Sequence, residues 1–413
     1  MSLSRREFAF AVPGAATLLA GIKTAPSLDD PLQVRKDFPV LEELTFLNTA
    51  YIGLHPQAVV DAGKDWLEGR ARGRHTVPQM LEKREETRKL FARLVGASED
   101  EIGFLYATSE GENVVVNSLE WKPGDNVVVN DLVYPSTPVI LRRLEQMQGI
   151  ELRMAKHQNG ATHIDDFARL VDDRTRLVSV ALVSNISGYR HDMKALADLA
   201  HHHGAYLYAD AVQAVGMGPL DVKALDIDFL TTGSYKWLGA GFGVAPFYVR
   251  RELLDRIHPT NVGWMVEKRL EGYQYQHYRT AQKFEYASLA FGEIYQLAAA
   301  LKYLESIGLE PIEAQSLALV DRLRKGLTAR GFRILTPEGN RSSIVSFYIR
   351  EEQPAAEKIL EEGRVKVSLQ NGERTEAYGG TGPLTRVRVA LSFFNNAGDV
   401  DRFLEVSEKL GTT

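Results

Sequence analysis

The stretch of sequence that decides the fold runs from residue 177 to residue 210. It opens with Leu-Val-Ser-Val-Ala-Leu-Val at 177–183 and closes with Ala-Tyr-Leu-Tyr-Ala at 205–209, which Asp210 follows directly. Both runs have the length and the apolar content of strands, and the segment between them, 193–203, has the pattern of a helix. The stretch therefore predicts a strand–helix–strand unit of a parallel sheet.

The same alternation continues on both sides of this unit. Further strand-like runs lie at 102–107, 126–130, 151–155, 228–232 and 244–249, and helical segments lie near 111–119, 138–148 and 164–171. This order predicts an α/β fold with a mainly parallel sheet sandwiched by helices. After about residue 283, two long helices, short strands and a final helix predict a smaller α+β domain. We expect a large domain over 27–283 and a small C-terminal domain over 284–413.

The composition excludes several classes of protein. The chain has 413 residues, of which 44% are hydrophobic and 25% charged, as in a soluble protein with a large core. Its net charge of -5 gives no indication of a surface for nucleic acid, which is normally basic. The sequence has no cysteine, which excludes a disulfide framework, a zinc–thiolate site and a cysteine nucleophile. We identify no metal-ligand set, although a site built from histidine and carboxylates stays open.

The amino terminus resembles an export signal. Ser4-Arg5-Arg6-Glu7-Phe8 contains a twin-arginine pair, and a mildly apolar run follows at 9–22. This run is too short to span a membrane, which takes about 20 apolar residues. A basic start, a short apolar stretch and small residues before Pro26 predict a Tat-type signal peptide over 1–26 and export to the periplasm. The alternative is a disordered tail on a cytoplasmic protein.

Polar side chains stand where the expected strands end. Asp210 ends the strand at 205–209 and Gln213 follows it, Asn185 follows the preceding strand, and Lys236 follows the run at 228–232. In open α/β sheets, ligands bind beyond the carboxyl ends of the strands. A carboxylate and a lysine at one sheet edge can also form a structural ion pair, and taken alone the pattern favours that simpler interpretation.

A second signal follows the strand at 102–107, where Thr108-Ser109-Glu110-Gly111-Glu112 begins a helix. Ser109 and Glu112 match the S-x-x-E capping box, so a helix cap is a sufficient structural explanation. The same helix start would present free N–H groups, which suit a phosphate. From the sequence alone the cap is the favoured interpretation.

Taken together and in order, these motifs resemble the class V aminotransferases, enzymes of fold-type I that use pyridoxal 5'-phosphate (PLP). The resemblance runs from about residue 45 to the carboxyl end. Its most specific parts are Val183-Ser184-Asn185, the run 208–213 and Gly233-Ser234-Tyr235-Lys236; the segments 46–50, 108–110 and 284–288 and Arg388 also stand in the family's order.

The resemblance implies roles for these residues. Lys236 would hold PLP as an imine and move protons at the α-carbon of the substrate, and Asp210 would keep the pyridinium nitrogen protonated. These two would be the catalytic residues. Asn185 and Gln213 would bind the ring oxygen.

The remaining roles concern the phosphate, the substrate and the partner subunit. Ser109, the backbone at Glu110 and Tyr235 would hold the phosphate, and Tyr134 would stack on the cofactor. Arg388 would bind the substrate carboxylate through two contacts, with Asn48 as a second substrate-binding residue. Ser288 would reach the phosphate of the neighbouring subunit, which implies a homodimer with shared active sites.

These residues imply an enzyme that acts on an amino acid or on an amino group. Transamination is the family default; cleavage of a C–S bond and epimerisation at the α-carbon begin in the same way and stay open. Cysteine desulfurases of this family accept sulfur on a loop cysteine, and the corresponding stretch here, 368–373, has none. We therefore expect no persulfide-forming desulfurase. The alternative is a protein that is not an enzyme, namely an exported binding protein of the same fold that has lost turnover. The retention of Lys236 argues against it, because a binding protein does not need the lysine that forms the imine.

The predicted signal can be tested by fractionating the source cell. We expect the protein in the periplasmic fraction, because the twin-arginine route carries proteins that have already folded and loaded their cofactor. Recovery of the full-length chain only from the cytosol would contradict the prediction.

Overall fold

The computed structural model describes residues 30–265, 267–374 and 383–412, and the predicted signal peptide lies outside these ranges. Export therefore stays a prediction. In the described part, no helix combines the length and the apolar character that a membrane crossing needs.

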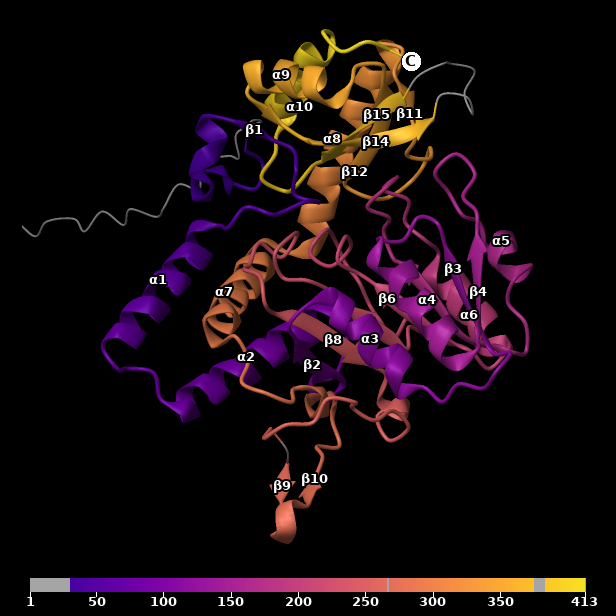
Figure 1. The fold of residues 1–413 in the computed structure, drawn as a ribbon. Coiled ribbons are helices and arrows are strands. Elements are labelled where there is room, and N and C mark those ends of the chain that lie inside the picture. Colours follow the sequence, from indigo (N-terminus) through magenta and orange to yellow (C-terminus); the bar gives the residue numbers. More distant parts are fainter. Residues whose placement is uncertain (1–29, 266, 375–382, 413) are drawn as a thin grey trace, which may run out of the picture.

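A seven-stranded sheet forms the centre of the large domain (Figure 1). The strand order is β2-β8-β7-β6-β5-β3-β4, and only β8 runs against its neighbours, so the predicted mainly parallel sheet is confirmed. The strands are β2 (Ile102–Leu105), β3 (Asn126–Asn130), β4 (Glu151–Ala155), β5 (Thr175–Ala181), β6 (Tyr206–Asp210), β7 (Phe229–Thr231) and β8 (Ala245–Val249).

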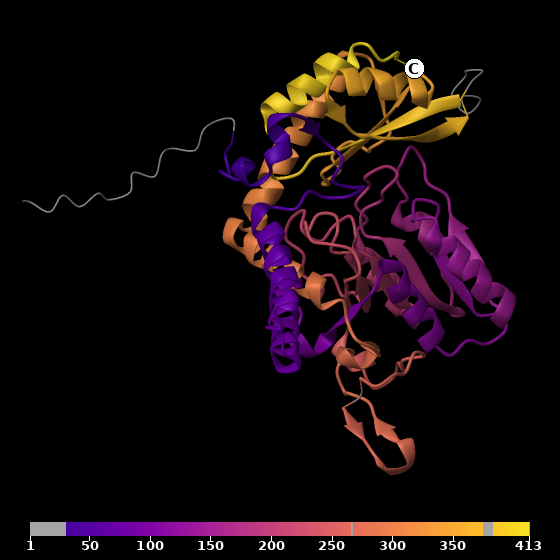
Figure 2. The ribbon, with the colours of Figure 1, turned by 60° about the vertical axis from the view of Figure 1, so that its left-hand side comes forward.

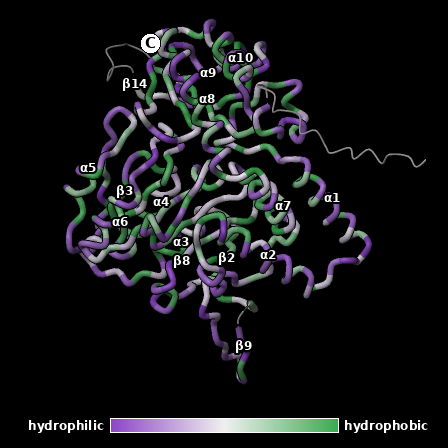
Figure 3. The backbone as a smooth tube through the Cα atoms, turned by 180° about the vertical axis from the view of Figure 1, so that it is seen from behind, coloured by the Kyte–Doolittle hydropathy of each residue, from purple (hydrophilic) through white to green (hydrophobic). Residues whose placement is uncertain are grey.

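Helices cover both faces of this sheet. On one face lie α3 (Thr108–Ser118) and α4 (Ser136–Gln148), whose apolar side chains share a core with Val127 and Val129 of β3. The other face packs around Val128 and is covered by α2 (Val77–Val95), α5 (Ile164–Ala168), α6 (Met193–His202) and α7 (Phe291–Ile307). Successive residues of β3 thus face opposite layers, as a strand requires. In Figure 3 hydrophilic and hydrophobic segments alternate along the outer helices, which bury one side only.

The small domain is built on a four-stranded antiparallel sheet, ordered β11-β12-β15-β14. Its core joins Leu323, Phe347, Val387 and Phe403. Its elements are α8 (Leu309–Ala329), β11 (Arg333–Ile334), β12 (Ile344–Ile349), α9 (Gln353–Glu362), β13 (Val365–Lys366), β14 (Ser368–Arg374), β15 (Pro383–Ala390) and α10 (Ala397–Ser407).

Two segments depart from the division expected at residue 283. The helix α7 packs against α2 and α1 (Gln57–Ala71), and its Ile294 and Leu301 belong to the core of the large domain, so the chain enters the small domain near Gly308. The early strand β1 (Thr45–Phe46) instead pairs with β13 of the small domain. Helical periodicity reveals an apolar face, but it does not reveal which core that face joins.

A short hairpin of β9 (Lys268–Arg269) and β10 (Tyr275–Gln276) was not expected from the sequence. It projects from the large domain at the end opposite the small domain (Figures 1 and 2). Short 3-10 helices complete the described part at Arg35–Asp37, Pro39–Glu42, Glu99–Glu101, Arg251–Leu253, Glu271–Tyr273 and Ala281–Phe284.

A buried ion cluster joins α2 to β2 next to the site. Glu285, which is 1% exposed, accepts hydrogen bonds from Arg84 Nη1 at 3.2 Å, Arg88 Nη1 at 2.8 Å and the backbone N–H of Phe104 at 3.0 Å. Two guanidinium groups and a strand amide thus share one carboxylate away from water. Glu85, which is more exposed, also pairs with both arginines. Removing the charge of Glu285 would leave these buried cations with that outer anion alone.

We expect Glu285→Gln to lower the free energy of unfolding by about 3 kcal/mol, because the buried arginines keep their charge. Glu305→Gln is the matched control: Glu305 pairs with Arg93 on the surface, and its loss should cost less than about 1 kcal/mol. Denaturant unfolding of the two variants measures both values. Equal, small losses would show that the cluster does not hold α2 on the sheet.

Candidate active site

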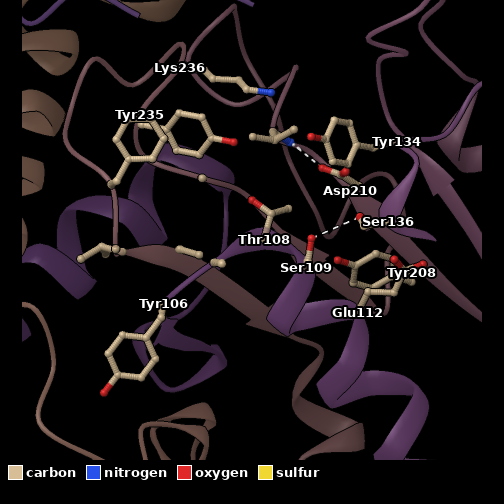
Figure 4. A pocket seen from close by; sticks show the side chains of 17 residues that line it. Tyr106, Thr108, Ser109, Glu112, Tyr134, Ser136, Tyr208, Asp210, Tyr235 and Lys236 are labelled. Carbon is tan, nitrogen blue, oxygen red and sulfur yellow. Dashed lines mark hydrogen bonds between the residues drawn. The ribbon is translucent and has the colours of Figure 1, made fainter. Parts of the chain in front are cut away.

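A cavity of about 240 Å³ opens beyond the carboxyl ends of the parallel strands. Residues that follow β2, β3 and β7 line it, together with the end of β6 and the start of β8 (Figure 4). This is where open α/β sheets bind ligands. Seven residues from the motifs of the sequence analysis line the cavity: Thr108, Ser109, Glu112, Tyr134, Asp210, Tyr235 and Lys236.

Lys236 is held in a tight turn at the cavity wall, and the residue is 7% exposed. The N–H of Gly53 donates to the carbonyl of Tyr235 at 2.9 Å. A Cβ at Gly53 would lie 1.9 Å from the carbonyl oxygen of Lys236, so only glycine permits this approach. The pKa of Lys236 is lowered to about 8, mainly by burial; the charge of Asp210 opposes this shift and that of Arg388 adds to it. The amine is therefore easily made neutral and nucleophilic.

Asp210 faces this amine from the end of β6. Its Oδ1 accepts a hydrogen bond from the backbone N–H of Val212 at 3.0 Å. Burial raises the pKa of Asp210, while the Val212 amide and the positive charge of Lys236 act in the opposite direction. A carboxylate at this depth, opposite an amine, can keep a heterocyclic nitrogen protonated.

The start of α3 forms the part of the cavity wall that contains Thr108 and Ser109. Ser109 Oγ donates to Ser136 Oγ at 3.2 Å, and the buried hydroxyl of Thr108 has no hydrogen-bond partner among the described residues. No side chain caps the helix, whose N-cap is Ala107. A Cβ at Gly233 would lie 3.1 Å from Thr108 Oγ1, so the cradle depends on that glycine. Hydroxyls and open helix N–H groups suit a phosphate.

The capping-box interpretation of Ser109 and Glu112 is wrong. Ser109 is the second residue of α3 rather than its cap. The carboxylate of Glu112 turns into the protein, where Ser179 Oγ and Thr137 Oγ1 donate to it at 2.7 and 2.8 Å. Contacts with distant parts of the chain therefore replace the local hydrogen bond that the motif predicts.

Three further predicted cofactor residues lie at or beside the cavity. Tyr134 lines it and is half exposed, and Tyr235 lines it with its ring stacked on Phe242, 4.2 Å between ring centres. The backbone N–H of Glu110 donates to the carbonyl of Ala107 at 3.0 Å. Which groups each of them binds stays a prediction.

Gln213 and Asn185 differ in their freedom to bind a ring oxygen. Gln213 Nε2 donates to the carbonyl of Ala50 at 2.9 Å, and its Oε1 accepts from Trp237 Nε1 at 2.8 Å. It thereby ties the segment before Gly53 to the turn that carries Lys236. The buried Oδ1 of Asn185, in contrast, has no hydrogen-bond partner among the described residues, and the Nδ2 group of the same amide would be the donor to a ring oxygen.

The expected substrate residues lie between the two domains. Arg388 is 2% exposed, and its Nη1 donates to the carbonyl of Asn185 at 3.0 Å. Burial lowers the pKa of Arg388 to about 10, and Arg386 adds to the shift. In the described part, Arg388 Nε and Asn48 Oδ1 lack hydrogen-bond partners, and Asn48 bridges to Ala390 on the same strand as Arg388. A buried guanidinium that forms no ion pair with the described residues suits a substrate carboxylate.

Ser288 is exposed and does not line the cavity of its own chain. Its carbonyl accepts a hydrogen bond from the Tyr106 hydroxyl at 2.9 Å. The homodimer expected from Ser288 thus stays a prediction. Across the described ranges, no group of three or more acidic or histidine side chains is placed to hold a metal ion.

Sequence reasoning missed several residues of the site. Thr108 and Ser136 flank Ser109 in space, and Gly53 fixes the Lys236 turn. Tyr208 also lines the cavity, and it could have been found, because residues two apart on a strand share a face and Asp210 was already chosen. No sequence signal pairs Ser136 with Ser109.

Comparisons with known proteins identify the family of the chain. The model of the aminotransferase class-V family matches residues 46–403. A probable cysteine desulfurase of Pyrococcus abyssi (strain GE5 / Orsay) is 30% identical over 92% of this chain and 97% of its own length. The apo structure of a cysteine desulfurase from Thermococcus onnurineus NA1 has a TM-score of 0.83, with 29% identity over 93% of this chain and 98% of that one.

A third comparison concerns the cofactor. A solved variant of the protein C-DES, with glycine covalently linked to its PLP cofactor, has a TM-score of 0.81 at 20% identity, over 91% of this chain and 99% of that one. The residues of this chain fit PLP, because its cavity joins a buried amine and a facing carboxylate to a hydroxyl-lined helix start. PLP is the cofactor of this chain.

One expectation needs correction. We expected no persulfide-forming cysteine desulfurase because the sequence has no cysteine, but relatives of this chain carry that very name. The inference failed because a missing thiol removes one acceptor for sulfur, whereas the site that binds the amino acid is built from other residues. Matched over most of its length by the family model, the chain belongs to the class V aminotransferase family.

Proposed function

We propose that this enzyme breaks the C–S bond of cysteine or of a closely related amino acid. The observation that carries the proposal is the buried Lys236 amine, which shares the cavity with Asp210 and lies close enough to Arg388 for the charge of Arg388 to lower its pKa. PLP supplies the electron sink that weakens the bonds at the substrate α-carbon. The names of the relatives support a C–S lyase over the family default of transamination.

The residues of this chain divide the work. Arg388 binds the carboxylate of the substrate and sets its orientation, because its charge is buried and forms no ion pair within the described part of the chain. Lys236 takes the proton from the α-carbon and returns it, for which a pKa of about 8 is well matched to neutral pH. Burial of the amine excludes water from the atoms that react.

The sulfur has two possible fates. If a thiol accepts it, cysteine and the thiol give alanine and a persulfide; if it leaves as sulfide, cysteine and water give pyruvate, ammonia and hydrogen sulfide. The sequence has no cysteine, so an accepting thiol would come from outside these 413 residues. The products therefore tell the two routes apart.

We expect purified holoenzyme to release sulfur from L-cysteine. Alanine should form in proportion to an added thiol such as dithiothreitol if the thiol accepts the sulfur, and pyruvate should form without it if sulfide leaves. Amino-acid analysis, a pyruvate assay and a sulfide assay measure the products.

Two outcomes would contradict the proposal. Formation of the sulfur-containing keto acid, with no sulfur released, would indicate transamination; racemised cysteine alone would indicate epimerisation. Lys236→Ala is the control and should lose both products.

Gel filtration of the active enzyme should place the activity in a dimer, and an active monomer would remove the role expected for Ser288.

The lowered pKa of Lys236 predicts how fast the apoprotein takes up PLP. The neutral amine is the reactive form, so the rate at which the yellow imine band appears should rise about tenfold from pH 7 to pH 9 and level off above the pKa of about 8. Stopped-flow absorbance measures this rate, and Lys236→Ala should give no band. A colourless wild-type protein would instead favour a binding protein without turnover.

A further inference from the structure

Glu112 is a buried carboxyl group that the proposed reaction does not use. It lines the same cavity as Asp210, next to Tyr208, and is 2% exposed (Figure 4). Its two oxygens accept hydrogen bonds only from hydroxyls, those of Ser179 and Thr137. Within the described ranges, no lysine, arginine or histidine forms an ion pair with it. A carboxylate so deeply buried without a cation is unstable unless it is protonated.

The groups that face Glu112 favour its neutral form. From β6 it meets Asp210 and Tyr208, whereas α4 and β5 offer only the two hydroxyls, and β2 and β7 have no titratable side chain. Burial raises the pKa of Asp210 as well, but the Val212 amide and the positive charge of Lys236 favour its ionised form. Burial raises the pKa of Glu112 to about 7, and the charge of Asp210 acts in the same direction.

Glu112 also lies behind the end of the cavity that suits a phosphate. Thr137, its partner, directly follows Ser136, which accepts the hydrogen bond of Ser109. Two neighbouring hydrogen bonds thus join α3 to α4. The bond between Ser109 and Ser136 lies at the end that suits a phosphate, and the bond between Thr137 and Glu112 lies behind it. The start of α3 favours a single anion in front of it, so a second negative charge one turn further along would oppose a bound phosphate.

We propose that Glu112 is a positioning residue that the protein holds as a neutral carboxylic acid, and that its ionisation repels the phosphate of PLP and weakens binding of the cofactor. The neutral acid donates to one hydroxyl oxygen and accepts from the other, so both of its oxygens stay hydrogen-bonded. The inference rests on PLP as the cofactor and is independent of the reaction that the loaded enzyme performs.

The test compares the affinity of the wild-type and Glu112→Gln apoproteins for PLP between pH 6 and pH 8.5, by titration of the cofactor absorbance. Glutamine keeps the size of the side chain but cannot ionise. The dissociation constant of the wild type should rise about tenfold more than that of E112Q over this range. Changes common to both proteins, including those from Lys236 and from PLP itself, cancel in the ratio. Identical pH dependence in the two proteins would overturn the proposal.

Pyridoxal, which lacks the phosphate, is the matched ligand control. The wild type and E112Q should bind it with the same pH dependence; an equal difference for pyridoxal would show that the charge acts elsewhere and would overturn the phosphate assignment. Thr137→Val is a second variant that leaves Glu112 in place. It removes a hydrogen bond to the carboxylate, so the midpoint of the binding profile should move to higher pH, and an unchanged midpoint would contradict the account.

Discussion

The structure of the site depends on one electrostatic arrangement, a buried lysine amine and a buried aspartate carboxylate at the same cavity. Burial disfavours the charge on each group, while each favours the charge on the other. The pKa of Lys236 is thereby kept at about 8, close to neutral pH, and the charge of Lys236 opposes the rise that burial causes in the pKa of Asp210. Neither group would have these properties alone.

The rest of the fold holds these two groups at a fixed separation. Asp210 is placed by β6, the central strand of three parallel neighbours, while Lys236 lies in the turn after β7. That turn is gripped from a distant part of the chain through the contact with Gly53, and Gln213 ties the same segments together. The early segment also pairs with the small domain through β1, so one stretch of chain connects the lysine turn to the domain that presents Arg388.

Much of the fold could be predicted because buried parallel strands have a local signature. The runs at 126–130 and 151–155 were predicted with the bounds that β3 and β4 have. The parts that could not be predicted depend on tertiary contacts. The apolar face of α7 is visible in the sequence, but its partner is not, and the hairpin of β9 and β10 has almost no buried residues to mark it.

The site shows the same division. Lys236, Asp210 and Asn185 could be found because each follows a strand, and the order of motifs identified the family. Glu112 was misread because the capping-box pattern is local, whereas its real partner Ser179 lies 67 residues away in the sequence. The absence of cysteine was read as a statement about the reaction, although it concerns only where sulfur can go.

The most direct measurement of the central claim is to locate the covalent bond to PLP. Reduction of the holoenzyme with borohydride, proteolysis and mass spectrometry should find the phosphopyridoxyl group on Lys236 and on no other lysine, including the buried Lys283. Modification of a different lysine, or of none, would contradict the account of the site.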